Sequence, residues 1–250
     1  MMFSPAGFFA IYRREMRAWF TTPLAYVFLA AFAFAAPAFA FNVGRFFDTN
    51  RADLSPLFAY MPWLLMILMP ALAMRAWAEE RDRGTLEILL SLPVSVSSIA
   101  LAKFAAAWSV SLGALVATLP MWIAVNYLGN PDNLAIAIAY MGAFLLAGSY
   151  LAIGQALSAA SGSQVTAFVL SVLATLLMTM AGLPLVTDSL SGTAPAFVVE
   201  ALAYSSVLER FSAFERGVVG FGDLVYFLTL IGFGIAAGGL QAGASREGGR

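Results

Sequence analysis

The sequence predicts an all-α membrane protein that crosses the bilayer six times. Composition is the first reason: 61% of the 250 residues are hydrophobic and 11% are charged, whereas soluble domains are about 45–50% apolar. The second reason is spacing, since windows of about 19 residues detect six apolar stretches that are each long enough for a hydrocarbon core of about 30 Å. These spans lie near 24–43, 57–74, 102–125, 134–157, 164–186 and 223–242. We therefore expect one membrane domain over residues 1–250, with both ends of the chain on the same side.

Several local signals refine these spans. Pro62 and Pro70 fall within the second span and are candidates for a kink, and "GNPD" at 129–132 predicts a tight turn between the third and fourth spans. Gly234 and Gly238 form a G-x-x-x-G pattern on the last span. Small residues at this spacing are typical of closely packed membrane helices.

The distribution of basic residues predicts which side faces the cytoplasm. Nine of the thirteen Lys and Arg residues fall on the N-terminal segment, the 75–103 segment and the C-terminus, and four fall on the opposite side. The nine are Arg13, Arg14, Arg17, Arg75, Arg81, Arg83, Lys103, Arg246 and Arg250, and the four are Arg45, Arg51, Arg210 and Arg216. Because cytoplasmic loops carry the excess of Lys and Arg, we expect a multi-pass protein of the inner (plasma) membrane with both termini cytoplasmic.

A basic amphipathic helix is expected over residues 5–21, before the first span. Its arginines and its aromatic residues fall on opposite faces, as in helices that lie in the membrane interface. The basic face holds Arg13, Arg14 and Arg17, and the apolar face holds Phe8, Phe9, Tyr12, Met16, Trp19 and Phe20. A cleaved signal peptide is the alternative, because "AFAFAAPAFA" offers small-residue cleavage sites. We disfavour cleavage, since the apolar stretch is too long and its basic residues do not stand at the very start.

The region 188–222 is less regular, and we expect short helices there against the outer leaflet. It divides at Ser205–Ser206 into two amphipathic pieces. Val207, Leu208, Phe211 and Phe214 fall on one side of the second piece. These pieces are expected to close the helix bundle from outside, before the last span.

Residue content argues against several classes of function. The sequence has no cysteine and no histidine, which removes disulfides, imidazole bases and nearly every zinc or iron site. Its single lysine, Lys103, follows no glycine-rich loop, so the chain cannot bind ATP through a Walker A motif. The net charge of −1 argues against a nucleic-acid partner. No charged residue lies in the interior of a span, which disfavours an ion-coupled carrier or an intramembrane protease.

A charge-rich segment, "WAEERDRGTLEILLSLPVS" at 77–95, separates two of the spans. Its spacing predicts an amphipathic helix over 79–92, in which Arg83 pairs with Glu79 and Glu87 one turn away on either side. Leu86, Leu89 and Leu90 fall together on this helix, and Pro93 stops it. Composition alone favours a solvated loop. The alternative is a docking element whose apolar ridge fills a groove on another protein.

Three stretches resemble the permeases of ABC-2 type transporters. "AEERDRGTLEILLSLPVS" is similar to their first cytoplasmic loop, where Gly-Thr-x-Glu, an aliphatic pair and a proline form the coupling helix. "YRREMRAWFTTPLAYVFLA" at 12–30 resembles their N-terminal elbow helix, and "FSAFERGVVGFGDLVYFLTLIGF" at 211–233 resembles their last outer loop and sixth span. The nearest branch comprises permeases associated with gliding motility and with nitrous-oxide-reductase maturation. Glu209-Arg210-Phe211 departs from that branch, where a histidine often precedes the phenylalanine.

The resemblance implies the permease subunit of an ABC exporter. Such a subunit pairs with a second copy or a close homologue in the membrane and docks a separate cytoplasmic ABC ATPase, which holds the ATP and Mg while the permease itself holds no cofactor and no metal. The implied coupling residues are Glu79, Glu80, Arg83, Gly84, Thr85, Glu87 and Leu89, with Arg13, Arg14 and Arg17 on the elbow beside them. The uncharged span faces suit a lipid-like or polymeric substrate, or force transmission. A membrane anchor that scaffolds a complex without transport is the alternative function.

The six-span topology predicts where reporters should be found. A reporter fused after Arg250 should be cytoplasmic, as should one inserted near Gly162, and one inserted near Asn130 should lie outside. Paired reporters that are active only in the cytoplasm or only outside it measure this directly. A C-terminal fusion found outside would contradict the six-span count.

Overall fold

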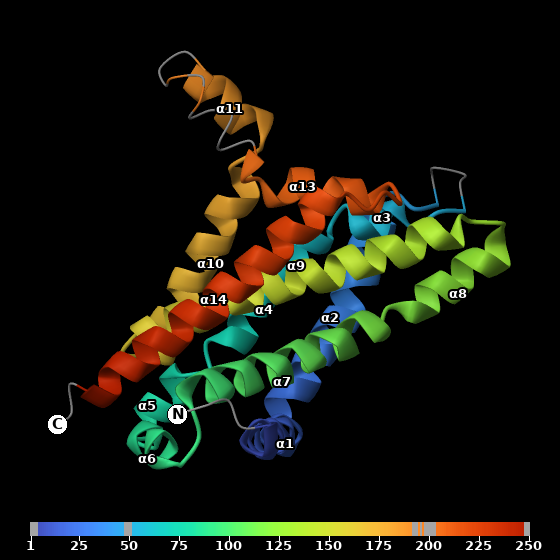
Figure 1. The fold of residues 1–250 in the computed structure, drawn as a ribbon. Helices are drawn as coiled ribbons and strands as arrows, with labels where there is room; N and C mark the ends of the chain where they lie inside the picture. The colour runs from blue at the N-terminus through green and yellow to red at the C-terminus, as the bar shows by residue number, and fades with distance from the viewer. Residues whose placement is uncertain (1–4, 48–51, 192–194, 196, 198–203, 248–250) are drawn as a thin grey trace.

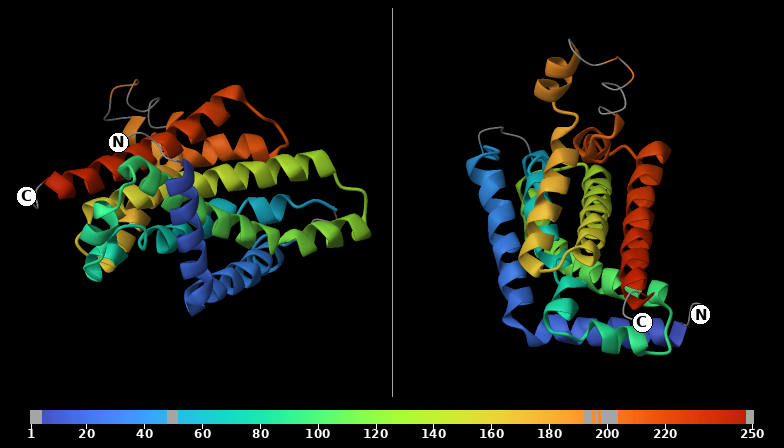
Figure 2. Two further views of the ribbon diagram at one scale, coloured as in Figure 1. Left: turned by 60° about the horizontal axis from the view of Figure 1, so that its bottom comes forward. Right: turned by 90° about the vertical axis from the view of Figure 1, so that its left-hand side faces the viewer.

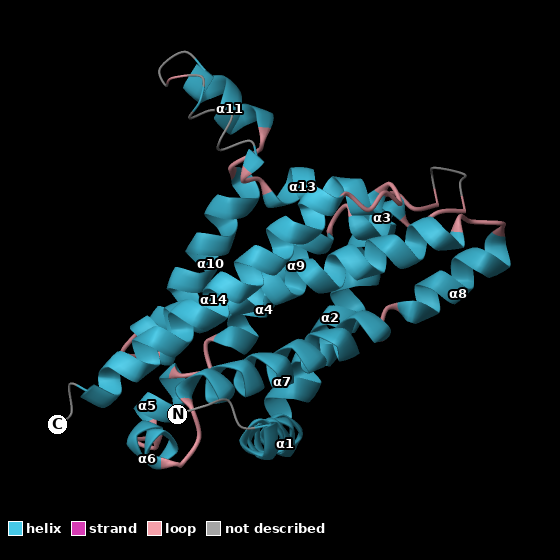
Figure 3. Cartoon of the chain, in the orientation of Figure 1, coloured by secondary structure: helices cyan, strands magenta, loops and turns pink. Residues whose placement is uncertain are grey.

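The computed structural model describes residues 5–47, 52–191, 195, 197 and 204–247, and within these ranges it is helical with no β-strand (Figures 1 and 3). The prediction of an all-α fold is therefore confirmed for this part of the chain. The helices are α1 (Pro5–Thr21), α2 (Pro23–Asn42), α3 (Ser55–Phe58), α4 (Met61–Ala73), α5 (Ala78–Asp82), α6 (Leu86–Ser91), α7 (Val96–Val116), α8 (Leu119–Leu128), α9 (Asn133–Ala160), α10 (Gln164–Met180), α11 (Pro184–Ser191), α13 (Val207–Glu215) and α14 (Phe221–Glu247).

Five helical segments are long and apolar enough to cross a membrane. They are Pro23–Asn42, Met61–Asp82, Val96–Leu128, Asn133–Ala160 and Phe221–Ala244. Three of the predicted spans have clearly different bounds. The second, expected over 57–74, is the segment Met61–Asp82. The third, expected over 102–125, is a longer pair of helices, α7 and α8. The fifth, expected over 164–186, ends as α10 at Met180 and is 17 residues long. Gly182 and Pro184 follow this end, and both residue types disfavour continuation of a helix.

Helix α1 lies crosswise to the spans and at one end of them (Figure 2, right). Helices α5 and α6 lie at this same end, whereas α3, α13 and the α8–α9 turn lie at the other (Figure 1). Arg13, Arg14 and Arg17 are exposed on α1, and Trp19 is buried. The predicted segregation of arginine and aromatic faces is thus confirmed in part, since Phe9 and Phe20 are also exposed.

Helix α9 is the centre of the bundle and packs against α4, α7, α10, α13 and α14. Its contact with α14 depends on the absence of a side chain at Gly234, where an added carbon would come within 2.5 Å of the Ala152 backbone. Gly142 likewise leaves room for the Phe214 ring of α13. The predicted role of Gly234 in close helix packing is confirmed, because backbones approach closely where side chains are small.

Where the membrane helices are interrupted, side-chain hydroxyls form hydrogen bonds with backbone groups that lack a partner in the helix. Ser158 Oγ of α9 donates to Met74 O at 2.9 Å and accepts from Trp77 N at 3.1 Å and Ala78 N at 3.0 Å. These three groups belong to the turn between α4 and α5, where the intrahelical partners are missing. Since lipid offers no hydrogen bonds, such groups must be paired inside the protein.

Proline 70 has a similar local consequence. It lies inside α4 and has no amide hydrogen to donate to Met66 O. The hydroxyl of Thr175 on α10 lies 3.2 Å from this carbonyl oxygen. Pro62, by contrast, stands in the first turn of α4, where a missing amide hydrogen costs little.

Helix α13 closes the end of the bundle opposite α1. It begins at the Ser206 cap, whose hydroxyl accepts from Glu209 N at 3.4 Å, and it buries Val207, Phe211 and Phe214. Arg210 on the same helix forms an ion pair with Asp223 of α14 at 3.0 Å. The apolar face predicted for this piece is confirmed, whereas most of the preceding piece falls outside the described residues.

Replacing Ser158 with alanine should destabilise the bundle by about 1–3 kcal/mol, because buried amide and carbonyl groups lose their partner. Unfolding of the purified chain by a denaturing detergent, followed by circular dichroism, measures this. Ser171→Ala is the matched control, since that buried hydroxyl bonds only Ala167 O within its own helix. Equal stability of the two variants would contradict this account of the α4–α5 junction.

Candidate functional site

The charge-rich segment 77–95 forms two short helices rather than the single helix predicted over 79–92. Helix α5 ends at Asp82 and α6 begins at Leu86. Between them Gly84 has φ of +68°, in the left-handed region that glycine adopts without strain. No atom would meet a side chain there within 4 Å, so backbone conformation rather than crowding requires glycine.

The break changes the predicted ion pairs. Arg83 pairs with Glu79 at 2.6 Å, which confirms the first of them. The second is wrong: within the described part of the chain no ion pair joins Arg83 to Glu87, because the two residues lie on opposite sides of the glycine turn. Glu79 instead has Arg75 as its second partner, at 2.6 Å. Arg75 also stacks over the Trp19 ring of α1, with 4.5 Å between guanidinium and ring centre.

Glu80 joins α5 to three other elements. Its carboxylate lies 3.1 Å from Lys103 Nζ on α7 and also bonds Arg14 of α1 and the Thr85 hydroxyl. Lys103 is held by Glu15 as well, at 3.0 Å, and its side chain is only 2% exposed. A buried ammonium group is costly to desolvate unless it is paired. The two carboxylates therefore allow Lys103 to be buried here. Hereafter the network of Arg14, Glu15, Glu80 and Lys103 is called the clamp.

Two residues that sequence reasoning missed tie α5 to the α9–α10 junction. Arg81 Nη2 donates to Ala159 O at 3.0 Å, and Arg81 also bonds Ser161 O. Asp82 accepts a hydrogen bond from Gln164 N at 3.3 Å. Arg81 thus places a positive charge at the carboxyl end of α9, and Asp82 places a negative charge at the amino end of α10. The helix dipoles favour both placements. The alternating charges in "EERDR" could have suggested such contacts, but their partners lie far away in the sequence.

The leucine ridge of α6 faces inward. Leu86, Leu89 and Leu90 are buried with Trp77 and Ile11. The docking alternative, in which this ridge fills a groove on another protein, is wrong for these three leucines, because they cover the ends of α1, α7 and α14. The outward face of α6 instead carries Glu87, Ile88, Ser91 and Leu92, and the Ile88 side chain is 66% exposed.

Only one of the three predicted elbow arginines reaches the clamp. Arg14 bonds both Glu15 and Glu80, whereas Arg13 and Arg17 are exposed on the same helix. Burial alone would lower the pKa of Arg14, but the two carboxylates reverse this and raise the pKa. The guanidinium therefore stays charged and serves as a permanent partner for Glu80.

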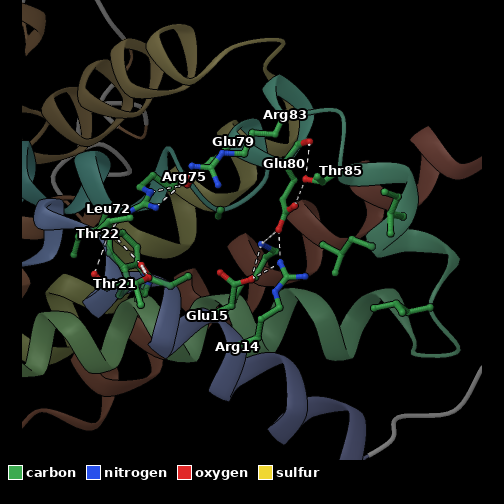
Figure 4. Close-up of a pocket in the computed structure, with 18 residues that line it drawn as sticks. Arg14, Glu15, Thr21, Thr22, Leu72, Arg75, Glu79, Glu80, Arg83 and Thr85 are labelled. Carbon is green, nitrogen blue, oxygen red and sulfur yellow. Dashed lines mark hydrogen bonds and ion pairs between the residues drawn. The ribbon is translucent and has the colours of Figure 1, made fainter.

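A cavity of about 560 Å³ lies between α1 and the α5–α6 segment (Figure 4). It contains the clamp together with the Arg75–Glu79–Arg83 group. Its lining residues are Arg14, Glu15, Ala18, Trp19, Thr21, Thr22, Leu72, Arg75, Ala76, Glu79, Glu80, Arg83, Thr85, Ile88, Leu89, Leu92, Lys103 and Ala107. Among the described residues no cluster of acidic side chains is arranged to hold a metal ion.

Comparison with known proteins identifies a family for most of the chain. A family model described as an ABC-2 family transporter protein covers residues 50–204, which include both α5–α6 and the central helix α9. The search of curated proteins found no match.

Loss of the Glu80 carboxylate should loosen α1 from the rest of the molecule. Glu80→Ala leaves Arg14 and Lys103 with only Glu15, so trypsin should cut after the arginines of α1 several-fold faster than in the wild type. Limited proteolysis followed by mass spectrometry measures the rate. Glu87→Ala is the control, because that exposed carboxylate lies in the same segment outside the clamp. Equal cleavage rates for the two variants would mean that Glu80 does not hold α1.

Proposed function

The chain belongs to the ABC-2 family of transporter proteins, and from this premise we propose that it is the permease subunit of an ABC exporter whose ATP hydrolysis occurs in separate subunits. The observation that carries the proposal is the outward face of α6, with Ile88 and Leu92 exposed beside Glu87. Exposed apolar side chains beside a charged one suit insertion of a helix into a groove on another protein. In this proposal α5 and α6 together are the coupling element, and the partner ATPase holds ATP and Mg.

The proposed membrane arrangement has six spans. Five segments satisfy length and hydropathy by themselves. Helix α10 is the remaining span, since 17 residues reach about 26 Å and lie at the lower limit of observed spans. Helix α1 is then the elbow in the cytoplasmic interface of the inner membrane, and both termini are cytoplasmic. The whole of 1–250 forms a single membrane domain.

Exposed apolar side chains on the spans leave room for a partner within the membrane. Tyr26, Val27 and Phe34 on α2 are well exposed, and such a surface meets lipid or another permease subunit. We propose a dimer with a second copy or a close homologue, and a place in the branch linked to gliding motility and nitrous-oxide-reductase maturation. A lipid-like or polymeric substrate, or force transmission, fits the uncharged span interiors.

The contacts of α5 suggest how movement reaches the membrane. When ATP binding closes the ATPase pair, α6 moves with the subunit that holds it. Helix α5 transfers this movement to α1 and α7 through Glu80, to the turn after α4 through Glu79, and to the α9–α10 junction through Arg81 and Asp82. The linkage is reciprocal, so a change at the spans alters the affinity of the ATPase for ATP.

A membrane anchor without transport is the alternative. It shares the family and the fold, but it needs no coupling between α6 and ATP hydrolysis. ATPase stimulation separates the two functions, because a coupled permease changes the turnover of its ATPase and a passive anchor leaves it unchanged.

Changing the outward face of α6 should release the ATPase without disturbing the fold. Ile88→Asp places a charge on a 66% exposed side chain, so membrane insertion and thermal stability should stay unchanged. Recovery of ATPase with the tagged chain should fall at least about tenfold, since an interface anchor is typically worth ~2 kcal/mol or more. The measurement is ATP hydrolysis co-purified from native membranes at matched expression.

The matched control is Leu134→Asp. It makes the same exchange at a 71% exposed side chain in the first turn of α9, at the opposite end of the bundle. It should keep the ATPase. Equal recovery of the ATPase with the wild type, Ile88→Asp and Leu134→Asp would contradict the proposal. Segment 77–95 would then be only a solvated loop.

A further inference from the structure

The cavity between α1 and the α5–α6 segment lies at the end of the spans that α1 crosses. Helix α1 runs across the ends of the spans (Figure 2). Its arginines are exposed. Such basic amphipathic helices lie in the headgroup region of a bilayer. Trp19, Thr21 and Thr22 line the cavity from this helix and its link to α2. Its mouth is therefore accessible to a lipid of the same leaflet.

The charges of the cavity favour a singly charged anion. Arg14, Arg75, Arg83 and Lys103 line it, against three carboxylates, Glu15, Glu79 and Glu80. Each carboxylate already has two cationic partners. The lining therefore carries one more positive charge than negative charges. Because the carboxylates are already paired, this excess charge can attract a phosphate group.

Two guanidinium groups still have donors available. In the ion pairs of the described residues, Arg14 and Arg83 use only Nη2. Their side chains are 48% and 65% exposed, whereas Arg75 already uses Nε and both terminal nitrogens. Guanidinium forks bind phosphate oxygens with two parallel hydrogen bonds. Arg14 and Arg83 are therefore the side chains that can bind the anion.

The remaining lining is apolar and suits an amphiphile. Leu72, Ile88, Leu92 and the Trp19 ring stand beside the charged groups. A volume of about 560 Å³ lies within the range of pockets that hold whole small molecules, roughly 300–1,000 Å³. This is room for a headgroup with the start of its acyl chains, and it is much more than one phosphate ion fills.

We propose that this cavity binds an anionic phospholipid of the bilayer as a resident ligand, with its phosphodiester between Arg14 and Arg83 and its glycerol and upper acyl chains against Trp19 and Leu72. The bound lipid joins α1 to the α5–α6 segment. The site requires only that the chain lies in a membrane. The cavity shares Ile88 and Leu92 with the proposed ATPase-docking face, but lipid binding is measured on the purified chain without an ATPase.

Native mass spectrometry of the detergent-purified chain tests this, with phosphatidylglycerol and phosphatidylcholine of identical acyl chains as probes. The wild type should retain phosphatidylglycerol in preference to phosphatidylcholine. Arg14→Gln with Arg83→Gln should weaken that binding about tenfold, or ~1.4 kcal/mol. Arg13→Gln with Arg17→Gln removes the same charge outside the cavity and should leave the binding largely intact.

A steric variant makes the test independent of charge. Ala18 lines the cavity from an exposed position, so Ala18→Trp should fill the space and expel the lipid while the chain stays folded. This variant decides the matter if the Arg14/Arg83 variant does not fold. A third arm adds inorganic phosphate at the lipid concentration, and it should not compete.

Four outcomes would overturn the proposal. They are equal retention of the two lipids, equal losses in the two arginine double variants, full retention by Ala18→Trp, and displacement by inorganic phosphate. The second would indicate diffuse attraction to a basic surface, and the last a site for the free ion. None of these outcomes bears on ATPase docking, so this inference and the proposed function can fail separately.

Discussion

The ion pair between Lys103 and Glu80 is the contact on which the arrangement of the α5–α6 segment depends. Lys103 is almost fully buried and lies 3.1 Å from this carboxylate. An ammonium group without a partner would be unstable there. Because Glu80 also bonds Arg14 and Thr85, one side chain holds the crosswise helix α1, the membrane helix α7 and the start of α6 together.

The segment thereby divides into an inner and an outer helix. The charged residues of α5 all have partners within the molecule: Glu79, Glu80, Arg81 and Asp82 bind α1, the turn after α4, α7 and the α9–α10 junction. Helix α6 adds its buried leucines and leaves Glu87 and Ile88 outside. An element that is fixed at many points on one side and exposed on the other can transmit force. This property fits the coupling role that we propose for the segment.

Sequence patterns predicted whatever depends on local spacing. Apolar length located the membrane helices, and helical periodicity gave the buried face of α13, with Phe211 and Phe214. The patterns failed where contacts with residues distant in the sequence determine the structure. The leucines of α6 form an apolar face whichever way the helix is turned, and contacts with the ends of α1, α7 and α14 orient this face inward. Arg81 and Asp82 were missed for the same reason. The break at Gly84 was foreseeable from glycine's conformational freedom, but the continuous i, i+4 charge pattern outweighed it.

Photocrosslinking from α6 tests most directly the claim that a clamped segment presents its outer face to an ATPase. A photoreactive amino acid at Glu87 should give an adduct with the ATPase in native membranes, and the yield should change when ATP is added. The same amino acid at Leu90, which is buried one turn away, should give adducts only within the chain. An ATPase adduct from Leu90 and none from Glu87 would contradict the account, because the ridge would then face outward and the clamp could not be as described.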